Sequence, residues 1–292
     1  MKIAITGTNG RVGGALSDFF RSGNHEVISL RREDVDLCDL SALREALQSL
    51  DFDAWINPAA MSSPDECERD PVLGHRINAT APALMADVCR QRDKYLLHFS
   101  TDYVFAGDTS GKCHEEAPAH PLNAYGKSKR EGELAVLSSG ARATVLRVSW
   151  VYGAKAPAFV EQCMARLQEG AGLEAIADKW SIPTAMPDLC HWIEHLLIEQ
   201  PSALLHGCHS GEPVSWYGIA VAVHEIMRKN GLLDDDATIV PTLLQDARQF
   251  IARRPIHTAM DNHRLSSLLP RPIADWREAL ERVISMRRQD SR

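Results

Sequence analysis

The chain has 292 residues, of which 45% are hydrophobic and 24% are charged, and its formal net charge is −7. This length predicts one large domain or two domains that share an interface, and the acidic balance argues against nucleic acid or an anionic membrane as a partner. Residues 1–7 run directly into a glycine turn, and no window reaches the roughly 18–20 apolar residues of a membrane span. We therefore expect no signal peptide and a cytoplasmic location.

Strand-like apolar runs alternate with helix-like segments through the first half of the chain. The strand-like runs cover 2–6, 26–30, 54–57, 95–100 and 143–148, and the helix-like segments cover 12–21, 40–50, 79–92 and 131–137. This alternation predicts an α/β fold, a doubly wound parallel sheet of Rossmann type with helices on both faces. The nucleotide-binding domain would span residues 1–155.

The second half is less regular and richer in proline. Helix-like segments cover 159–168, 188–199, 215–229 and 274–288. We expect residues 156–292 to form mainly a smaller, irregular substrate-binding region, with segments around 188–222 returning to the first domain. The run Asp234-Asp235-Asp236 is interpreted as a solvated loop. Four tryptophans are interpreted as packing residues, although the first of them could stack on a base or sugar: Trp180, Trp192, Trp216 and Trp276.

Cysteine and histidine spacing gives no sign of a metal site. The seven cysteines are scattered and form no CxxC pair, which predicts reduced side chains without a disulfide framework. His206 and His209 lie three residues apart, but no acidic or cysteine partner completes a set of ligands. We therefore expect no bound metal.

A glycine-rich turn follows the first predicted strand and opens the first predicted helix. It reads Gly7-Thr8-Asn9-Gly10-Arg11-Val12-Gly13. Glycines allow a sharp turn, and the free N–H groups of a helix N-terminus attract a pyrophosphate. The placement favours a dinucleotide site over an ordinary tight turn.

Two arginines, Arg31 and Arg32, come directly after the second predicted strand. An acidic residue at this point suits the ribose of NAD, whereas an arginine suits the 2′-phosphate of NADPH. The alternative is a solvated pair that Glu33 and Asp34 partly neutralise. The sequence thus indicates NADPH as the cofactor, with NADH as the alternative.

Two further motifs carry acid–base chemistry. Tyr125 and Lys129 are four residues apart, so they share one face of a helix; a nearby ammonium lowers the pKa of a phenol and lets it give a proton to a carbonyl oxygen. Thr101 directly follows the strand-like run 95–100. It therefore lies at the carboxyl end of a predicted strand, which is where ligands of doubly wound sheets bind. The alternatives are a surface tyrosine with a lysine neighbour and a hydroxyl that satisfies its own turn.

The order of these motifs resembles the extended short-chain dehydrogenases/reductases and, within them, the dTDP-4-dehydrorhamnose reductase family. The similarity is specific over about residues 1–155. The segments that carry it are Asn57-Pro58-Ala59-Ala60, Ile77-Asn78-Ala79-Thr80-Ala81-Pro82, Ser100-Thr101-Asp102-Tyr103-Val104-Phe105, Asn123-Ala124-Tyr125-Gly126-Lys127-Ser128-Lys129 and Arg147-Val148-Ser149-Trp150-Val151-Tyr152-Gly153.

The resemblance implies NADPH-dependent reduction of the 4-keto group of a nucleotide-activated 6-deoxyhexose. Tyr125 would donate the proton, Lys129 would lower the pKa of Tyr125 and hold the nicotinamide ribose, and Thr101 would polarise the carbonyl. The implied cofactor contacts are Gly10, Arg11 and Val12 along the pyrophosphate, Asp39 and Leu40 beside the adenine, and Ala59, Ala60, Met61 and Ser62 along the cofactor. Asp102, Trp150 and Arg254 would contact the substrate.

Departures from the family pattern leave the substrate open. Arg11 stands where a glutamine is common, and Ala15 stands where some members carry a magnesium-binding glutamate. Asp178-Lys179-Trp180-Ser181 replaces a usual Asp-Gln-x-Gly, and Arg254-Pro255-Ile256-His257-Thr258 replaces a usual Arg-Pro-x-x-Ser. The sequence therefore does not choose the sugar, the nucleotide or the product stereochemistry.

Three other functions stay open at this point. An epimerase of the same fold would retain NAD, which the arginine pair disfavours, and a dehydratase would need an acidic pair beside Thr101. A regulatory subunit that binds NADP without turnover would not need Tyr125 and Lys129. The resemblance also implies that a homodimer is plausible.

Overall fold

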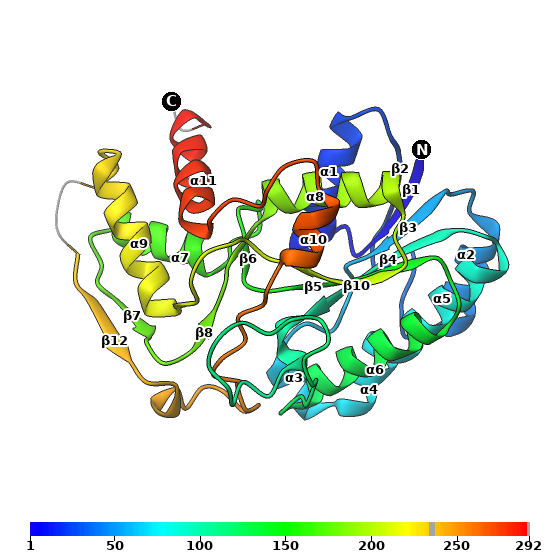
Figure 1. Cartoon of the computed structure of the whole chain (residues 1–292), viewed down its shortest axis with the longest axis horizontal. Helices are drawn as coiled ribbons and strands as arrows, with labels where there is room; N and C mark the ends of the chain where they lie inside the picture. Colours follow the sequence, from blue (N-terminus) through cyan, green and yellow to red (C-terminus); the bar gives the residue numbers. More distant parts are fainter. Residues whose placement is uncertain (234–236, 291–292) are drawn as a thin grey trace.

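A six-stranded parallel sheet forms the centre of the molecule (Figure 1). The computed structural model describes residues 1–233 and 237–290, with side chains through residue 286, so the loop expected at 234–236 lies outside the described residues. The strands in sheet order are β10 (Ala203–Gly207), β5 (Ala143–Val148), β4 (Tyr95–Thr101), β3 (Ala54–Asn57), β1 (Lys2–Thr6) and β2 (Glu26–Leu30). Every neighbouring pair is parallel, which confirms the predicted fold class.

Helices cover both faces of this sheet. One face packs against α2 (Leu40–Ser49), α5 (Ala81–Gln91) and α6 (Ala124–Ser138), and the other packs against α1 (Arg11–Ser22), α8 (Met186–Glu199) and α10 (His263–Leu268) (Figure 1). All seven residues of β4 are buried, as expected for a parallel strand between two helical layers. The strand order reverses at β1, between β2 and β3, and ligands of such sheets bind beyond the carboxyl ends of the strands at that point.

The helical run before α5 holds α6 in place. It consists of α3 (Pro64–Arg69), α4 (Pro71–His75) and a π-helical turn (Arg76–Thr80) that continues into α5. Asn78 of the π-helical turn donates to the Ser128 hydroxyl of α6 at 3.0 Å. A Cβ on Gly132 would lie only 2.2 Å from the Asn78 carbonyl oxygen, so α6 approaches this turn as closely as glycine allows. The helix predicted at 131–137 begins at Ala124, and it carries Tyr125 and Lys129.

A second hydrophobic core lies beside the sheet, and we call the region built around it the cap. Its helices are α7 (Phe159–Gln168), α9 (Trp216–Lys229) and α11 (Trp276–Asp290). Three two-stranded sheets complete it, namely β7 (Leu173–Ile176) with β12 (Ile239–Thr242), β8 (Trp180–Ser181) with β11 (Val214–Ser215), and β6 (Val151–Tyr152) with β9 (Thr184–Ala185).

The chain passes more than once between the two cores. After entering the cap it returns to the sheet with α8 and β10, and α9 then lies in the cap. The segment 188–222 is thus divided between the two cores. Within residues 1–233 and 237–290, no helix is long and apolar enough to span a membrane, and the same residues contain no cluster of three or more histidine, cysteine or acidic side chains arranged to hold a metal.

Candidate active site

A cleft of about 1020 Å³ opens at the carboxyl ends of the central strands and extends to the cap. The glycine turn after β1 lines one part of it. Thr101 and Tyr125 line the middle, and Trp150 and Trp216 lie on the side of the cap. The cleft therefore brings the glycine turn and the predicted proton donor to one place, whereas four predicted cofactor residues lie outside its lining: Arg31, Asp39, Leu40 and Lys129.

The glycine turn has the geometry that a dinucleotide needs. Gly7 has φ +65°, and a Cβ on Gly13 would lie 2.3 Å from the Gly7 carbonyl oxygen, so a side chain would clash at Gly13 and strain the backbone at Gly7. Gly10 precedes α1 without a side-chain cap, which leaves the first N–H groups of the helix available to an anion. All six predicted residues of this turn line the cleft: Gly7, Asn9, Gly10, Arg11, Val12 and Gly13.

The Arg11 side chain holds a loop rather than reaching along the helix axis. Its Nη2 donates to the Pro157 carbonyl oxygen at 2.8 Å, and its Nε donates to the Ala156 carbonyl oxygen at 3.2 Å. These bonds tie the loop before α7 to the start of α1. Arg11 thus closes the rim of the cleft next to the glycine turn.

The two arginines after β2 lie in different surroundings. Arg32 lines the cleft, and its guanidinium is only loosely paired with Asp36, at 3.6 Å. Arg31 lies outside the cleft lining and pairs with Glu33 at 2.5 Å and Asp34 at 3.1 Å. Arg32 is therefore the arginine with both the position and the free donors to meet a phosphate in the cleft.

The adenine contacts expected at Asp39 and Leu40 remain a prediction. The Asp39 carboxylate caps α2 by accepting the N–H groups of Ser41 and Ala42, both at 3.0 Å, and neither Asp39 nor Leu40 lines the cleft. The preceding residues Val35, Asp36 and Leu37 do line the cleft. The predicted segment Ala59, Ala60, Met61 and Ser62 does line the cleft.

Thr101 and Tyr125 come from β4 and α6. Thr101 ends β4, and Tyr125 lies in the first turn of α6, which Asn123 caps by accepting the Gly126 N–H at 2.8 Å. Burial raises the pKa of Tyr125, and a hydrogen bond with the Thr101 hydroxyl opposes that rise. Tyr125 therefore carries its proton at neutral pH.

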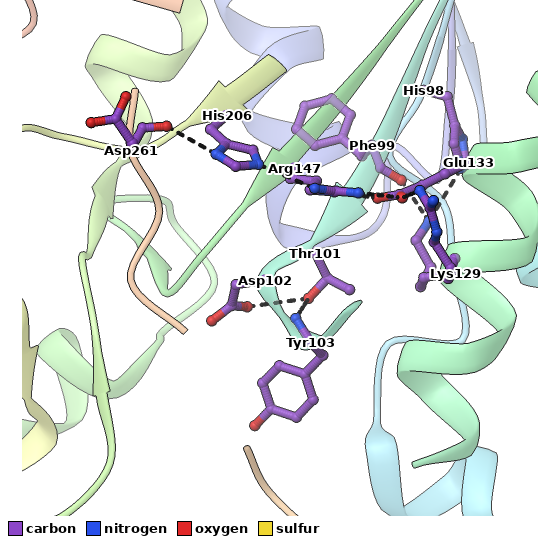
Figure 2. Close-up of polar contacts among 11 residues, drawn as sticks. His98, Phe99, Thr101, Asp102, Tyr103, Lys129, Glu133, Arg147, His206 and Asp261 are labelled. Atoms are coloured by element: carbon purple, nitrogen blue, oxygen red, sulfur yellow. Dashed lines mark hydrogen bonds and ion pairs between the residues drawn. The ribbon is translucent and has the colours of Figure 1, made fainter. Parts of the chain in front are cut away.

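Lys129 lies one turn along α6 and is buried behind Tyr125, with only 2% of the residue exposed. Its Nζ donates to the Phe99 carbonyl oxygen at 2.5 Å and lies 3.4 Å from His98 Nε2 (Figure 2). Burial lowers the pKa of Lys129 to about 8, against an opposing effect of Glu133. The sequence predicts that Lys129 lowers the pKa of Tyr125. In the structure burial has the largest influence on that pKa, and burial raises it.

A buried ion pair lies beside Lys129. Glu133 accepts from Arg147 Nε at 2.7 Å and from its Nη2 at 2.8 Å, and both side chains are almost fully buried. His206 Nε2 lies 3.3 Å from Arg147 Nη1, and His206 Nδ1 lies 2.9 Å from the Asp261 carbonyl oxygen (Figure 2). Burial lowers the pKa of His206 to about 3, so His206 is neutral at pH 7.

Asp102 connects β4 to the cap. Its Oδ2 accepts from Thr258 at 2.5 Å and from Ser181 at 3.2 Å, and its Oδ1 accepts from Thr101 at 3.3 Å. Burial raises the pKa of Asp102, and the positive charge of Lys179 opposes that rise. Asp102 lines the cleft as predicted, but its oxygens already bond to protein hydroxyls.

Lys179 is the buried cation of this junction. It is fully buried, its Nζ donates to the Pro255 carbonyl oxygen at 2.8 Å, and the charge lies over the rings of Tyr103 at 4.9 Å and Trp150 at 5.6 Å. Burial lowers its pKa to about 8. Lys179 thus supports the wall of the cleft from behind.

Of the two remaining residues expected to contact the substrate, one lines the cleft and the other does not. Trp150 lines the cleft and has an unusual φ of +44°. Arg254 lies outside the lining: its Nη2 donates to Asp65 at 2.8 Å, and the guanidinium packs on the Phe250 ring. The substrate contact predicted for Arg254 remains a prediction, and in the structure the guanidinium is bound to a carboxylate of α3.

The sequence reasoning missed an aromatic wall. Trp216, interpreted as a packing residue, lines the cleft together with Phe159, and the two rings stack with centroids 5.6 Å apart. Trp150 lies 5.6 Å from Trp216 on its other side. The signal for this position is that Trp216 directly follows the N-cap Ser215, so it lies at the first residue of α9, where the apolar face of the helix ends at the cleft. Trp180 instead stacks on His257.

Comparisons with known proteins give a consistent family. The family model described as RmlD substrate binding domain matches residues 1–288. The chain is 34% identical to the probable dTDP-4,6-dihydroxy-2-methyloxan-3-one 4-ketoreductase of Streptomyces antibioticus, over 96% of this chain and 93% of that protein. It is 32% identical to the dTDP-4-dehydrorhamnose reductase of Mycolicibacterium smegmatis, over 97% of this chain and 85% of that protein.

A solved structure agrees with the sequence matches. The crystal structure of dTDP-4-dehydrorhamnose reductase from Bacillus anthracis in complex with NADP superposes with a TM-score of 0.88 at 25% identity, covering 98% of this chain and 99% of that chain. The similarity thus extends over both the central sheet and the cap. The chain belongs to the RmlD substrate binding domain family.

Proposed function

We propose that this chain is an NADPH-dependent reductase that acts on the 4-keto group of a nucleotide-activated 6-deoxyhexose. The observation that carries the proposal is the meeting of Thr101 and Tyr125 in a cleft that also holds the glycine turn. The two similar proteins named above are a 4-ketoreductase and a reductase of dTDP-sugars, which supports this substrate class.

The cofactor fits the residues that line the cleft. A pyrophosphate would rest on the open N-terminus of α1, at the turn where a Cβ on Gly13 would clash with the Gly7 carbonyl oxygen. Arg32 would meet a 2′-phosphate, and Ala59, Ala60, Met61 and Ser62 would lie along the cofactor. When bound, NADPH supplies the hydride for the reduction.

The chain's own residues supply the proton and the positioning. Tyr125 gives its hydroxyl proton to the sugar oxygen as a C–H bond forms at the sugar carbon, so a ketone becomes an alcohol. The Thr101 hydroxyl lies beside Tyr125. Its proton, which Asp102 Oδ1 accepts in the structure, would turn to the sugar oxygen and then to the phenolate and stabilise negative charge there. Lys129 would hold the nicotinamide ribose and favour the phenolate that is left after proton transfer.

The aromatic wall would receive the sugar and its nucleotide. Trp150, Phe159 and Trp216 offer ring faces on the side of the cleft toward the cap, and such faces suit a sugar ring or a base. The relatives' names point to a dTDP-sugar. The sequence departs from the family pattern at Lys179 and at residues 254–258, on the same side of the cleft as the aromatic wall. The identity of the sugar is therefore to be determined by assay.

The test is a panel of 4-keto sugars linked to dTDP, UDP, GDP or CDP, each offered with NADPH and with NADH. We expect loss of nicotinamide absorbance with a dTDP-linked 4-keto-6-deoxyhexose and NADPH. An epimerase would convert its substrate without net consumption of the reduced cofactor. A regulatory subunit would bind NADPH without any absorbance loss, and either result would overturn the proposal.

A homodimer and a cytoplasmic location complete the proposal. Exposed apolar side chains of α4 and α6, namely Val72 at 79%, Leu134 at 50% and Leu137 at 40% exposure, support a surface that a second copy could cover. Sedimentation equilibrium of the chain and of a Leu134→Glu variant would test the dimer. A monomer at micromolar concentration would contradict it, and cell fractionation would test the location.

A further inference from the structure

The ammonium of Lys129 is held by neutral groups. It is buried, and the acceptors it meets in the structure are the Phe99 carbonyl oxygen at 2.5 Å and His98 Nε2 at 3.4 Å. The nearby Glu133 carboxylate is already bound by Arg147 and by Arg130. An ammonium has three N–H groups: Phe99 accepts one, and His98 accepts a second when its Nε2 carries no proton, so the positions of these two groups set the direction of the third.

His98 is one of these acceptors, and it is itself fixed by a buried chain. The imidazole is completely buried, and its Nδ1 lies 3.1 Å from Asn57 Nδ2. The Oδ1 of Asn57 lies 2.6 Å from the Thr6 hydroxyl, and Thr6 lines the cleft directly before Gly7. Four polar side chains thus connect α6 to the strand end beneath the glycine turn.

The number of protons on these side chains limits which hydrogen bonds the Thr6–Asn57–His98–Lys129 network can form. Burial, reinforced by the charge of Lys129, holds the pKa of His98 well below its usual range, so the ring carries a single N–H. When Lys129 is charged, Nε2 must accept from it, and the ring N–H then sits on Nδ1 and needs the amide oxygen of Asn57. When Lys129 is neutral, Nε2–H can donate to Nζ, and the amide nitrogen of Asn57 then faces Nδ1, which is the amide orientation in the structure.

The two states differ by a rotation of the Asn57 amide and a change of imidazole tautomer. An amide can rotate between them but does not release and take up a proton as an imidazole does. This network of hydrogen-bonded side chains therefore does not conduct protons between Thr6 and Lys129. It can only orient the amine and favour one of its charge states.

We propose that His98 is a positioning residue for Lys129: when the Asn57 amide rotates from the orientation in the structure, Nε2 accepts one N–H of the ammonium, which favours the charged amine and turns the remaining N–H toward the cofactor side of the cleft. This inference rests on the proposed function, because it takes Lys129 to contact the nicotinamide ribose. It adds a residue of β4 to the machinery that the resemblance places at Thr101, Tyr125 and Lys129.

Few other titratable groups act on Lys129. Glu133 faces it from α6, Cys67 faces it from α3, and both raise its pKa while burial lowers it. Tyr125 lies one helical turn before it. Replacing His98 leaves all three in place, so a change in the titration of Lys129 in that variant reports on the imidazole.

The experiment follows NADPH binding by fluorescence between pH 6 and pH 10, without any sugar. We expect affinity to fall as Lys129 loses its proton near pH 8, and we expect Lys129→Met to remove this dependence. In His98→Leu the fall should occur about one pH unit lower, which corresponds to roughly tenfold weaker binding at the pH where the two profiles diverge most. His98→Gln should restore the profile because its amide oxygen can accept from Nζ, whereas the shorter His98→Asn should not.

A matched control separates this effect from a loss of packing. His209 is also a buried histidine, it lies against Trp192 and Asp188 away from α6, and His209→Leu should keep the native profile. An unchanged profile in both His98→Leu and His98→Asn, or an equal shift in His209→Leu, would overturn the inference. Failure of the keto-sugar panel would count against the proposed reaction alone, since cofactor binding is measured without sugar.

Discussion

The cofactor side of the cleft and its cap side differ in how they are built. On the cofactor side, the glycine turn, residues 59–62 and the Thr101–Tyr125 pair all line the cleft where contiguous motifs placed them. On the cap side, Arg254 is bound to Asp65, and Trp216 takes a lining position that the sequence did not suggest. Strand ends and helix starts of one sheet converge by topology, whereas the cap is assembled from segments distant in the chain.

The largest effect should come from removing the proton donor on the cofactor side. Tyr125→Phe should lower kcat by roughly 100- to 10,000-fold, as expected for the loss of a general acid, and leave NADPH affinity within about twofold. Tyr103→Phe is a matched control, because Tyr103 also lines the cleft and its ring lies 5.7 Å from that of Tyr125. Stopped-flow absorbance with a keto-sugar nucleotide measures both variants, and equal losses would contradict the assignment.

Next in size is the buried charge on the cap side. Lys179→Met removes the buried positive charge that acts on Asp102 and the hydrogen bond to the Pro255 carbonyl oxygen, and we expect a loss of about 1.5–3 kcal/mol in the free energy of unfolding. Urea unfolding followed by circular dichroism measures it. Asp102→Asn in the same chain should recover part of the loss, because the unpaired charge is then absent. A Lys179→Met variant as stable as the native chain would show that the junction does not depend on this pair.

A third experiment separates the two arginines after β2. Arg32→Ala should weaken NADPH binding by about 1.5–3 kcal/mol, or roughly 10- to 100-fold, as expected for hydrogen bonds to a charged group. Arg31→Ala should have a smaller effect because Glu33 and Asp34 already hold that guanidinium. NADH binding serves as the control and should change little in either variant. The reverse order would return the 2′-phosphate to Arg31.

The smallest effect is a change in acid sensitivity. Because the pKa of His206 is about 3 in the folded chain and about 6.5 when unfolded, the unfolded state binds an extra proton between these values. Stability is thus lost as pH falls below about 6.5, by up to about 1.4 kcal/mol per pH unit from this group. His206→Gln should reduce this slope in urea unfolding between pH 4.5 and 7. An unchanged slope would assign the acid sensitivity to other groups.

The comparison also shows what the sequence could and could not predict. The five predicted strands are present, and β10 joins them, because a parallel sheet needs apolar runs that can be read locally. Asp39 and Leu40, predicted beside the adenine, lie outside the cleft lining because the Asp39 side chain caps α2 and the chain meets the cleft earlier, at Val35–Leu37. The partner of Arg254 is 189 residues away, and local patterning carries no information on such a contact.

The repeated passage of the chain between its two cores has a consequence for engineering. A chimaera that takes its sugar preference from a relative cannot be made with a single crossover near residue 155, since α8 and β10 would come with the foreign cap. The donor pieces would have to be inserted around the segments that return to the sheet, at 151–185, at 214–262 and from 274 onward, since α10 also packs on the sheet. To transfer substrate preference between two proteins of this fold, several separate segments of the cap therefore have to be replaced, because the cap is not one continuous piece of sequence.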